Sequence, residues 1–313
     1  MTKRVYHLFI NAPQGEYLRE VQDLYASLGL PGCCGSMDCT HVKWTLCPKG
    51  KKHHASGKEG YPTLVFQVAV DHNKRVLSVS QHFLGSVNDK TICENDLFSL
   101  GIKYRSLQNV EYELYNSVAT KYKYQGGYLI VDGGYIDSIC FIDPDKHRLH
   151  RDSVLWSEWL ESVRKDVECF FGILKSRWRF FKNGVVYHSA STMEHGFKTA
   201  CILNNLILLY DQKNESFSEE WETVDWVSLD PNVDEPDSLD DEDYDFSENI
   251  PAHVSHIQDD VIGRSQIESS RPTVSTNATN NEVTVFSIDD PKSKLKEALQ
   301  QSFVVQWIKQ KLM

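Results

Sequence analysis

The order of the apolar segments constrains the fold more than any other feature of this chain. Three short segments follow one another closely, "GSMDCTHVKW", "TLVFQVAV" and "VLSVSQHFLG", and the last two flank "DHNKR". This pattern predicts a strand followed by a β-hairpin. A helical pattern, "REVQDLYASL", precedes them and ends at "GLPG", and a further helix is expected after "NDKTICENDLF". A fourth strand, "YLIVDGG", leads to a long amphipathic helix, "WSEWLESVRKDVECFFGILKSRWRFF". The order predicts an α/β sheet covered by helices.

Composition excludes several classes of protein. The chain has 313 residues and 41% apolar content, which is enough for a packed core in at least part of it. The sequence has no uninterrupted apolar run near 18 residues and no charged-then-apolar leader, so we expect neither a membrane nor a secreted protein. The eight cysteines form no CxxC pair, which indicates reduced thiols and an intracellular protein.

Charge is distributed unevenly along the chain. Residues 1–210 carry 25 Lys and Arg against 21 Asp and Glu, whereas residues 211–313 carry 8 against 23. Sixteen acids and one base lie between 211 and 250. The mildly basic body permits a polyanionic partner, and we expect the acidic stretch to compete with DNA for its basic helix face.

The part of the chain after residue 212 differs in character from the body. Residues 213–290 are acidic, proline-punctuated or polar, so they cannot bury enough apolar area to offset the entropy of ordering, and we expect disorder. The segment 291–313 is different, because apolar residues recur in it at helical spacing. It predicts a short amphipathic helix that either docks on its own domain or binds a partner.

The long helix carries an apolar stripe that should face the sheet, formed by Val163, Val167, Phe170, Phe171, Leu174 and Trp178. Glu168 lies at the margin of this stripe, one turn before Gly172. A glycine inside a helix costs about 1 kcal/mol relative to alanine, so a close approach of metal or substrate beside Glu168 would explain it.

Two aspartates occupy positions where a bare carboxylate is costly. Asp132 ends the strand "YLIV", and Asp38 lies inside the strand "GSMDCT". A buried carboxylate needs a partner or a metal in place of water. If the two strands are neighbours and the long helix crosses their carboxyl ends, then Asp38, Asp132 and Glu168 converge. Carboxylates suit Mg²⁺ or Mn²⁺, and two such ions held about 4 Å apart can activate water and stabilise the leaving oxygen of a phosphodiester.

Five sequence blocks resemble the PIF/Harbinger transposase and Harbinger-derived nuclease family over about residues 20–210. They are "GCCGSMDCTHVKW", "GYPTLVFQVAV", "FLGSVNDKTI", "YLIVDGGYID" and "RKDVECFFGILKSRWRFF". The resemblance implies a DDE superfamily endonuclease with a ribonuclease-H-like fold, a mixed sheet with helices on both faces. It also implies the catalytic and metal-binding triad Asp38, Asp132 and Glu168, with 35 residues between the last two.

We therefore predict four regions: a helical lead-in over 1–30, the endonuclease domain over 31–212, the acidic and polar tail over 213–290 and the amphipathic helix over 291–313. The predicted function is metal-dependent hydrolysis of DNA phosphodiesters by two divalent ions, Mg²⁺ or Mn²⁺, with strand transfer as an allied step. The rival is a domesticated DNA-binding or scaffold protein without turnover. A metal-dependent phosphatase is a weaker third possibility, because the elongated basic row argues against a small substrate.

Family members usually carry an upstream helical DNA-binding region, whereas this chain begins about 20 residues before the region of resemblance. Target recognition is therefore expected to be truncated, or delegated to a separate DNA-binding partner protein. The expected location is the nucleus, or the cytoplasm without that partner. The sequence leaves the target DNA and the oligomeric state open.

Other residues have both a functional and a structural interpretation. Asp89 is either a fourth acid near the metal or an N-cap for the next helix. His41 and Tyr135 lie beside triad positions or only pack, and "CPKGKKHH" offers soft metal ligands without zinc spacing. The following basic residues suit DNA phosphates or merely form a solvated helix face: Arg164, Lys165, Lys175, Arg177, Arg179 and Lys182.

Overall fold

The structure is a computed structural model that describes residues 2–103, 107, 109–116, 120–135, 137–145, 150–212, 283–285 and 292–312. Its strands are β1 (Cys33–Lys43), β2 (Thr63–Val70), β3 (Val76–Val79), β4 (Phe83–Leu84), β5 (Glu111–Tyr115), β6 (Lys121–Gln125), β7 (Tyr128–Ile130), β8 (Phe141–Ile142) and β9 (Val283–Val285). Its helices are α1 (Thr2–Phe9), α2 (Gly15–Ser27), η1 (Lys49–Lys51), α3 (Lys52–Ala55), α4 (Asp89–Asn95), α5 (Leu97–Gly101), α6 (Arg151–Arg177), α7 (Arg179–Asn183), α8 (Ala190–Gln212) and α11 (Lys292–Leu312).

The main sheet is mixed, with the strand order β3-β2-β1-β7-β8 and with β4 paired to β2. Strands β1, β2 and β3 form an antiparallel meander, whereas β7 runs parallel to both β1 and β8. The hairpin predicted around "DHNKR" is therefore confirmed, and the strand "YLI" adjoins β1 as expected. This mixed sheet agrees with the predicted ribonuclease-H-like fold.

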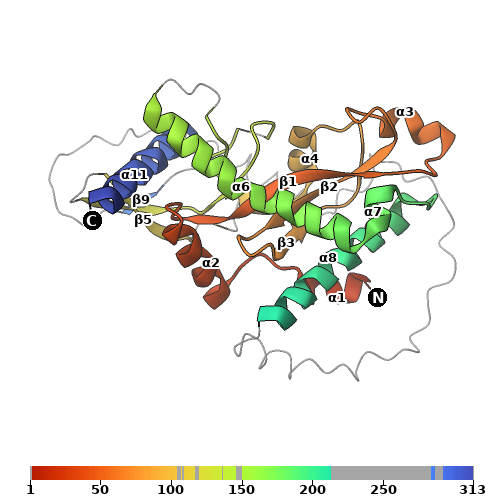
Figure 1. The fold of residues 1–313 in the computed structure, drawn as a ribbon, viewed down its shortest axis with the longest axis horizontal. Coiled ribbons are helices and arrows are strands. Elements are labelled where there is room, and N and C mark those ends of the chain that lie inside the picture. The colour runs from red at the N-terminus through yellow and green to blue at the C-terminus, as the bar shows by residue number, and fades with distance from the viewer. Residues whose placement is uncertain are drawn as a thin grey trace, which may run out of the picture. The chain divides into compact units, whose positions relative to one another are not determined.

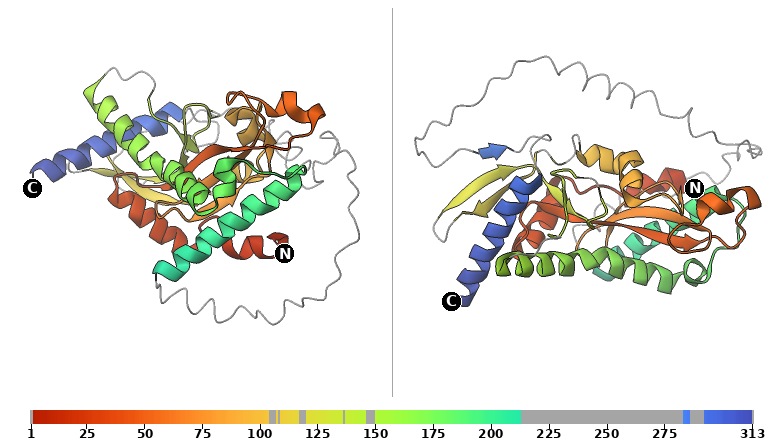
Figure 2. Two further views of the ribbon diagram at one scale, coloured as in Figure 1. Left: turned by 45° about the vertical axis from the view of Figure 1, so that its right-hand side comes forward. Right: turned by 90° about the horizontal axis from the view of Figure 1, so that it is seen from above.

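Helices cover both faces of the main sheet. Phe66 on β2 stacks on Phe197 of α8, with 4.2 Å between ring centroids, whereas its neighbour Gln67 donates to Asp96 at the start of α5. Successive side chains of a strand point to opposite faces, so α8 and α5 lie on different sides of β2. Figure 1 shows α6 running along β1, and the view from above in Figure 2 separates α6 from α4 across the sheet.

The long helix α6 buries the predicted stripe from Val163 to Leu174, together with Trp156 and Leu160. The C-terminal end of α6 differs from the prediction, because the helix ends at Arg177. We expected it to continue through Phe181, but the backbone of Trp178 leaves the helical region (φ −114°, ψ 80°) and the short helix α7 follows. Trp178 is consequently half-buried, and Phe181 packs against Phe197 from the new helix.

A second, three-stranded sheet was missed by the sequence analysis. Strands β5 and β6 form an antiparallel hairpin, and β9 pairs with β6 in parallel. In "EYELY" the burial alternates strictly, with Tyr112 and Leu114 inside. This period of two is the signal that would have identified β5.

The helix α11 docks on its own domain, which was one of the two expected outcomes. Leu295 and Leu299 are 1% exposed and belong to the main core. Phe303 stacks on Trp159 of α6, and Lys292 pairs with Asp143 at 2.8 Å. Residues 1–214 and 281–313 thus group into one compact unit.

Three further predictions concern disorder, the state of the cysteines and membrane spans. Disorder was predicted for residues 213–290, which was wrong for 283–285, because these form β9 by pairing with β6; the other residues of that range lie outside the described residues. All eight cysteines are free, in agreement with reduced thiols. Within the described ranges, each helix is too short or too polar to cross a bilayer.

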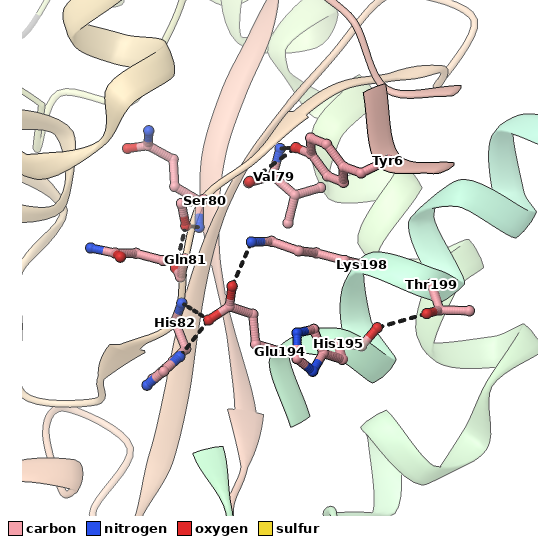
Figure 3. A network of polar contacts seen from close by, with 10 residues as sticks. Tyr6, Val79, Ser80, Gln81, His82, Glu194, His195, Lys198 and Thr199 are labelled. Atoms are coloured by element: carbon pink, nitrogen blue, oxygen red, sulfur yellow. Dashed lines mark hydrogen bonds and ion pairs between the residues drawn. The ribbon is translucent and has the colours of Figure 1, made fainter. Parts of the chain in front are cut away.

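A polar network joins α8 to the meander beyond β3, as Figure 3 shows. Glu194 accepts from His82 Nδ1 at 2.6 Å, from the His82 amide at 3.2 Å and from the Lys198 ammonium. Burial acts to raise the pKa of Glu194, but these donors and the Lys198 charge outweigh it and lower the pKa from 4.5 to about 2.

Replacing Leu299 by Ala tests the docking of α11. Removing a fully buried leucine side chain should lower the free energy of unfolding by about 2–5 kcal/mol, as measured by urea denaturation of the full chain. Glu297→Ala on the exposed side of the same helix is the matched control and should be nearly neutral. Equal stability of the two variants would contradict the packing described above.

Replacing Glu194 by Gln tests the polar network. Because the folded pKa of Glu194 is depressed, its stabilisation is present above the unfolded value near 4.5 and is lost as the pH falls toward 2. The wild type should exceed Glu194→Gln by up to about 3 kcal/mol at pH 6, and this difference should shrink toward pH 3. Glu113→Gln, whose side chain is half exposed, should show no such dependence. A difference between wild type and Glu194→Gln that is constant with pH would refute this account.

Candidate active site

Asp38 lies in the middle of β1, opposite Val68 of β2. Its side chain is 18% exposed, and its Oδ1 accepts the Cys39 amide at 2.8 Å. A central strand cannot expose its side chains as a loop does, so the carboxylate is held in a largely desolvated position.

Asp132 lies two residues after the end of β7. Ser36 of β1 is the parallel partner of Ile130, so two further residues along each chain lead to Asp38 and Asp132. The turn at "DGG" is closed by the Tyr135 amide, which donates to the Asp132 carbonyl at 3.2 Å. Asp132 is exposed, and its charge acts on Asp38. The predicted proximity of these two strands is therefore observed.

Glu168 is linked to Asp38 through Arg164, which forms an ion pair with each of them. Arg164, one turn earlier on α6, places Nη2 2.8 Å from Glu168 Oε1 and Nη1 3.2 Å from Asp38 Oδ2. The guanidinium thus bridges two of the three predicted acids. The sequence analysis assigned Arg164 to DNA binding and missed this role, although Arg and Glu four residues apart on a helix commonly pair.

The electrostatics of Asp38 reflect this crowding. Burial raises the pKa of Asp38 to about 6, and the negative charges of Asp132 and Asp89 act in the same direction. The Cys39 amide and Arg164 act against the rise without cancelling it. The carboxyl is therefore incompletely compensated by the protein's own groups.

Asp38, Asp132 and Glu168 are the type of ligand that a hard divalent cation prefers, but they do not lie close enough together to hold one in this structure. Carboxylate oxygens are the ligands that Mg²⁺ and Mn²⁺ prefer, and the raised pKa of Asp38 marks a place where added positive charge would be favourable. Within the described residues, however, no three acidic, histidine or cysteine side chains converge closely enough to hold an ion. The same finding applies to the described "CPKGKKHH" segment.

Asp89 is not an N-cap, so that expectation was wrong. The cap of α4 is Asn88, whose side chain accepts the Thr91 amide at 2.8 Å, and Asp89 is the first helical residue. Its carboxylate faces the "DGG" turn, since a Cβ added to Gly134 would lie 3.7 Å from Asp89 Oδ2. Asp89 thus belongs to the acidic surroundings of Asp38.

Residues beside the triad have structural partners. His41 Nδ1 lies 2.9 Å from Thr63 Oγ1, and burial lowers the pKa of His41. The Tyr135 hydroxyl lies 3.4 Å from Cys39 Sγ and is buried. Gly172 has open space where a Cβ would stand, so internal packing does not explain this glycine.

The six predicted DNA contacts fall into two groups. Arg164 is held by acids, Lys175 donates to the His41 carbonyl at 3.1 Å, and Arg177 donates to Asn204 Oδ1 at 2.7 Å. The other three, Lys165, Arg179 and Lys182, are exposed, and so is Arg177. Arg179 and Lys182 belong to α7 rather than to α6.

Comparison with known proteins agrees with the predicted family. Protein ALP1-like of Arabidopsis thaliana is 24% identical over 208 residues, which cover 65% of this chain and 49% of that protein. The chain thus spans about half the length of this curated relative. No solved structure matches. The profile described as plant transposon protein matches residues 7–215, about two thirds of the chain. The chain therefore belongs to the plant transposon protein family, which confirms the transposase-derived origin indicated by its resemblance to PIF/Harbinger transposases.

Proposed function

We propose that this protein is a DNA endonuclease of transposase type that depends on divalent metal ions and uses Asp38, Asp132 and Glu168. The main observation in favour is the parallel register of β1 and β7, which brings Asp38 beside Asp132 while α6 presents Glu168 to the same carboxylate through Arg164. The family supports a nuclease-like or transposase-like activity in general terms. A separate partner for target recognition and a nuclear location form part of the same proposal.

In this proposal the three carboxylates hold Mg²⁺ or Mn²⁺, two ions in all, which would supply an activated water and stabilise the leaving 3′ oxygen. Asp38 is the fixed ligand, because the Cys39 amide orients its Oδ1. Asp132 and Glu168 are exposed, so they can turn toward an ion. Arg164 must release Asp38 and Glu168 for all three acids to converge, since it bridges them. Strand transfer uses a 3′ hydroxyl in place of water at the same acids.

The second candidate is a domesticated DNA-binding or scaffold protein without turnover. The Arg164 bridge favours it, because the guanidinium partly compensates Asp38 and pairs with Glu168 without any metal. The two candidates differ in what happens to this bridge when a divalent ion is added.

Replacing Arg164 by Gln tests the electrostatic part of the proposal. The substitution removes a positive charge beside Asp38, so the pKa of Asp38 should rise above about 6. The carboxyl carbon shift of Asp38 followed by NMR from pH 4 to pH 9 measures this change. Lys165→Gln removes an adjacent exposed charge and should leave the midpoint unchanged. An unchanged or lower midpoint in Arg164→Gln would show that the bridge does not govern Asp38.

Replacing Asp132 by Asn separates enzyme from scaffold. The change keeps the size of the side chain but removes a charge that would hold the ion, so nicking of supercoiled plasmid should fall steeply. Thermal stability in EDTA should be equal or higher, because one of several crowded negative charges is lost. The melting shift that Mn²⁺ gives the wild type should weaken.

Glu168→Gln is the matched variant for this experiment, and DNA affinity should be kept or increased in both. If the wild type shows no Mn²⁺-induced melting shift and no nicking above the two variants, the endonuclease proposal fails and the scaffold takes its place.

A further inference from the structure

The connection between β1 and β2 carries a cluster of exposed cations that the predicted function does not use. Residues 43–58, here called the lysine loop, run from the last residue of β1 into this connection and contain five lysines; the exposed Glu59 follows them. All five are exposed, and they are Lys43, Lys49, Lys51, Lys52 and Lys58. Among the described residues, no ion pair neutralises any of them.

The lysine loop is fixed to the body by its backbone. The Ser86 amide donates to the His54 carbonyl at 3.1 Å, and the Trp44 amide donates to the Pro62 carbonyl at 2.9 Å. A Cβ on Gly57 would overlap the Gly85 carbonyl, and a Cβ on Gly85 would overlap the Ala55 carbonyl. Two glycines therefore allow the chain segments to touch, and the lysines are presented from an anchored loop.

The lysine loop adjoins the exposed cations of α7. Val185, just after α7, donates its amide to the Lys43 carbonyl at 2.9 Å, and its own carbonyl accepts the Thr45 amide at 3.1 Å. The Trp44 indole donates to the Tyr187 carbonyl at 2.8 Å. Figure 1 shows α3 and α7 at the same end of the sheet, away from α11. Arg179 and Lys182 thus extend the basic surface of the lysine loop.

We infer that the lysine loop is the nucleic-acid docking surface of this protein and binds the phosphate backbone of duplex DNA. This inference rests on the proposed function for the identity of the partner. The alternative surface on α6 is weaker, because Arg164, Lys175 and Arg177 already have partners within the protein. Lysines that present charge without planar hydrogen-bonding geometry suit phosphates rather than base edges.

The position of the lysine loop indicates which part of a substrate it contacts. Lys43 lies five residues beyond Asp38 on β1, so the two backbone positions are about 16 Å apart at the rise of an extended strand and their side chains point to opposite faces of the sheet. Phosphates of one strand are spaced by about 3.4 Å along the duplex axis, so the lysine loop meets DNA about five or more nucleotides from the phosphate at the acids. It therefore holds the flanking duplex and leaves the reacting phosphate to the acids.

The test compares two full-length variants that lose the same charge. One is Lys49→Gln/Lys51→Gln/Lys52→Gln, and the matched control is Arg19→Gln/Lys123→Gln/Arg151→Gln, whose three side chains are exposed elsewhere. Fluorescence anisotropy with a 30-base-pair duplex is followed over a series of salt concentrations. The lysine-loop variant should bind at least about tenfold more weakly near 0.1 M salt, with a salt slope reduced by about 2 to 3. The control should stay within about threefold of the wild type.

Two readouts separate this inference from the proposed function. The lysine-loop variant should keep the wild-type melting temperature and the wild-type melting shift with Mn²⁺. Duplex affinity is measured by anisotropy, so the test does not depend on whether the wild type nicks DNA. Equal loss in both variants, or no loss in the lysine-loop variant, would overturn the inference. It would also be overturned if the lysine-loop variant lost affinity for phosphatidylserine vesicles or for a peptide of residues 215–250 while duplex binding stayed unchanged.

Discussion

The burial of the Asp38 carboxylate inside β1 is the interaction on which the rest of the site depends. Removing such a charge from water costs several kcal/mol unless other groups compensate it. The protein supplies the Cys39 amide and one half of the Arg164 guanidinium, yet burial still raises the pKa of Asp38 to about 6. The apolar stripe of α6 sets the rotation of that helix, because its burial against the sheet turns Arg164 toward β1, where it pairs with Asp38 and with Glu168 of its own helix. The packing of α6 thus determines which charges surround the Asp38 carboxylate.

Much of the fold could be predicted because its strands have clear patterns. The β2–β3 hairpin and the stripe of α6 follow from periodicity alone, and the pairing of β1 with β7 follows from the family's fold. Local chemistry was harder to predict, since Asn88 and Asp89 are both good capping residues and only backbone geometry decides between them. The break at Trp178 and the docking of α11 depend on tertiary contacts that have no local signal.

For the candidate site, the sequence allowed the residue types to be predicted better than their contacts. The three acids were predicted from the sequence as the site, and Arg164, Lys175 and Arg177 were predicted to bind DNA because their charges were counted without their partners. The structure gives each of them an internal acceptor. The free positive charge lies instead on an anchored loop at the end of β1 that had been considered only as a source of soft metal ligands. In our proposal, the acidic centre of β1 acts on a phosphate and the basic loop at its end attracts the flanking polyanion.

The most direct test of the central claim is a crystal structure of the wild type soaked with Mn²⁺, with anomalous data collected at the manganese edge. Our account predicts an anomalous peak within about 2.5 Å of oxygens from both Asp38 and Asp132, with the Arg164 guanidinium released from Asp38. A structure in which Arg164 still bridges Asp38 and Glu168 at saturating Mn²⁺, with no anomalous peak at these acids, would contradict it.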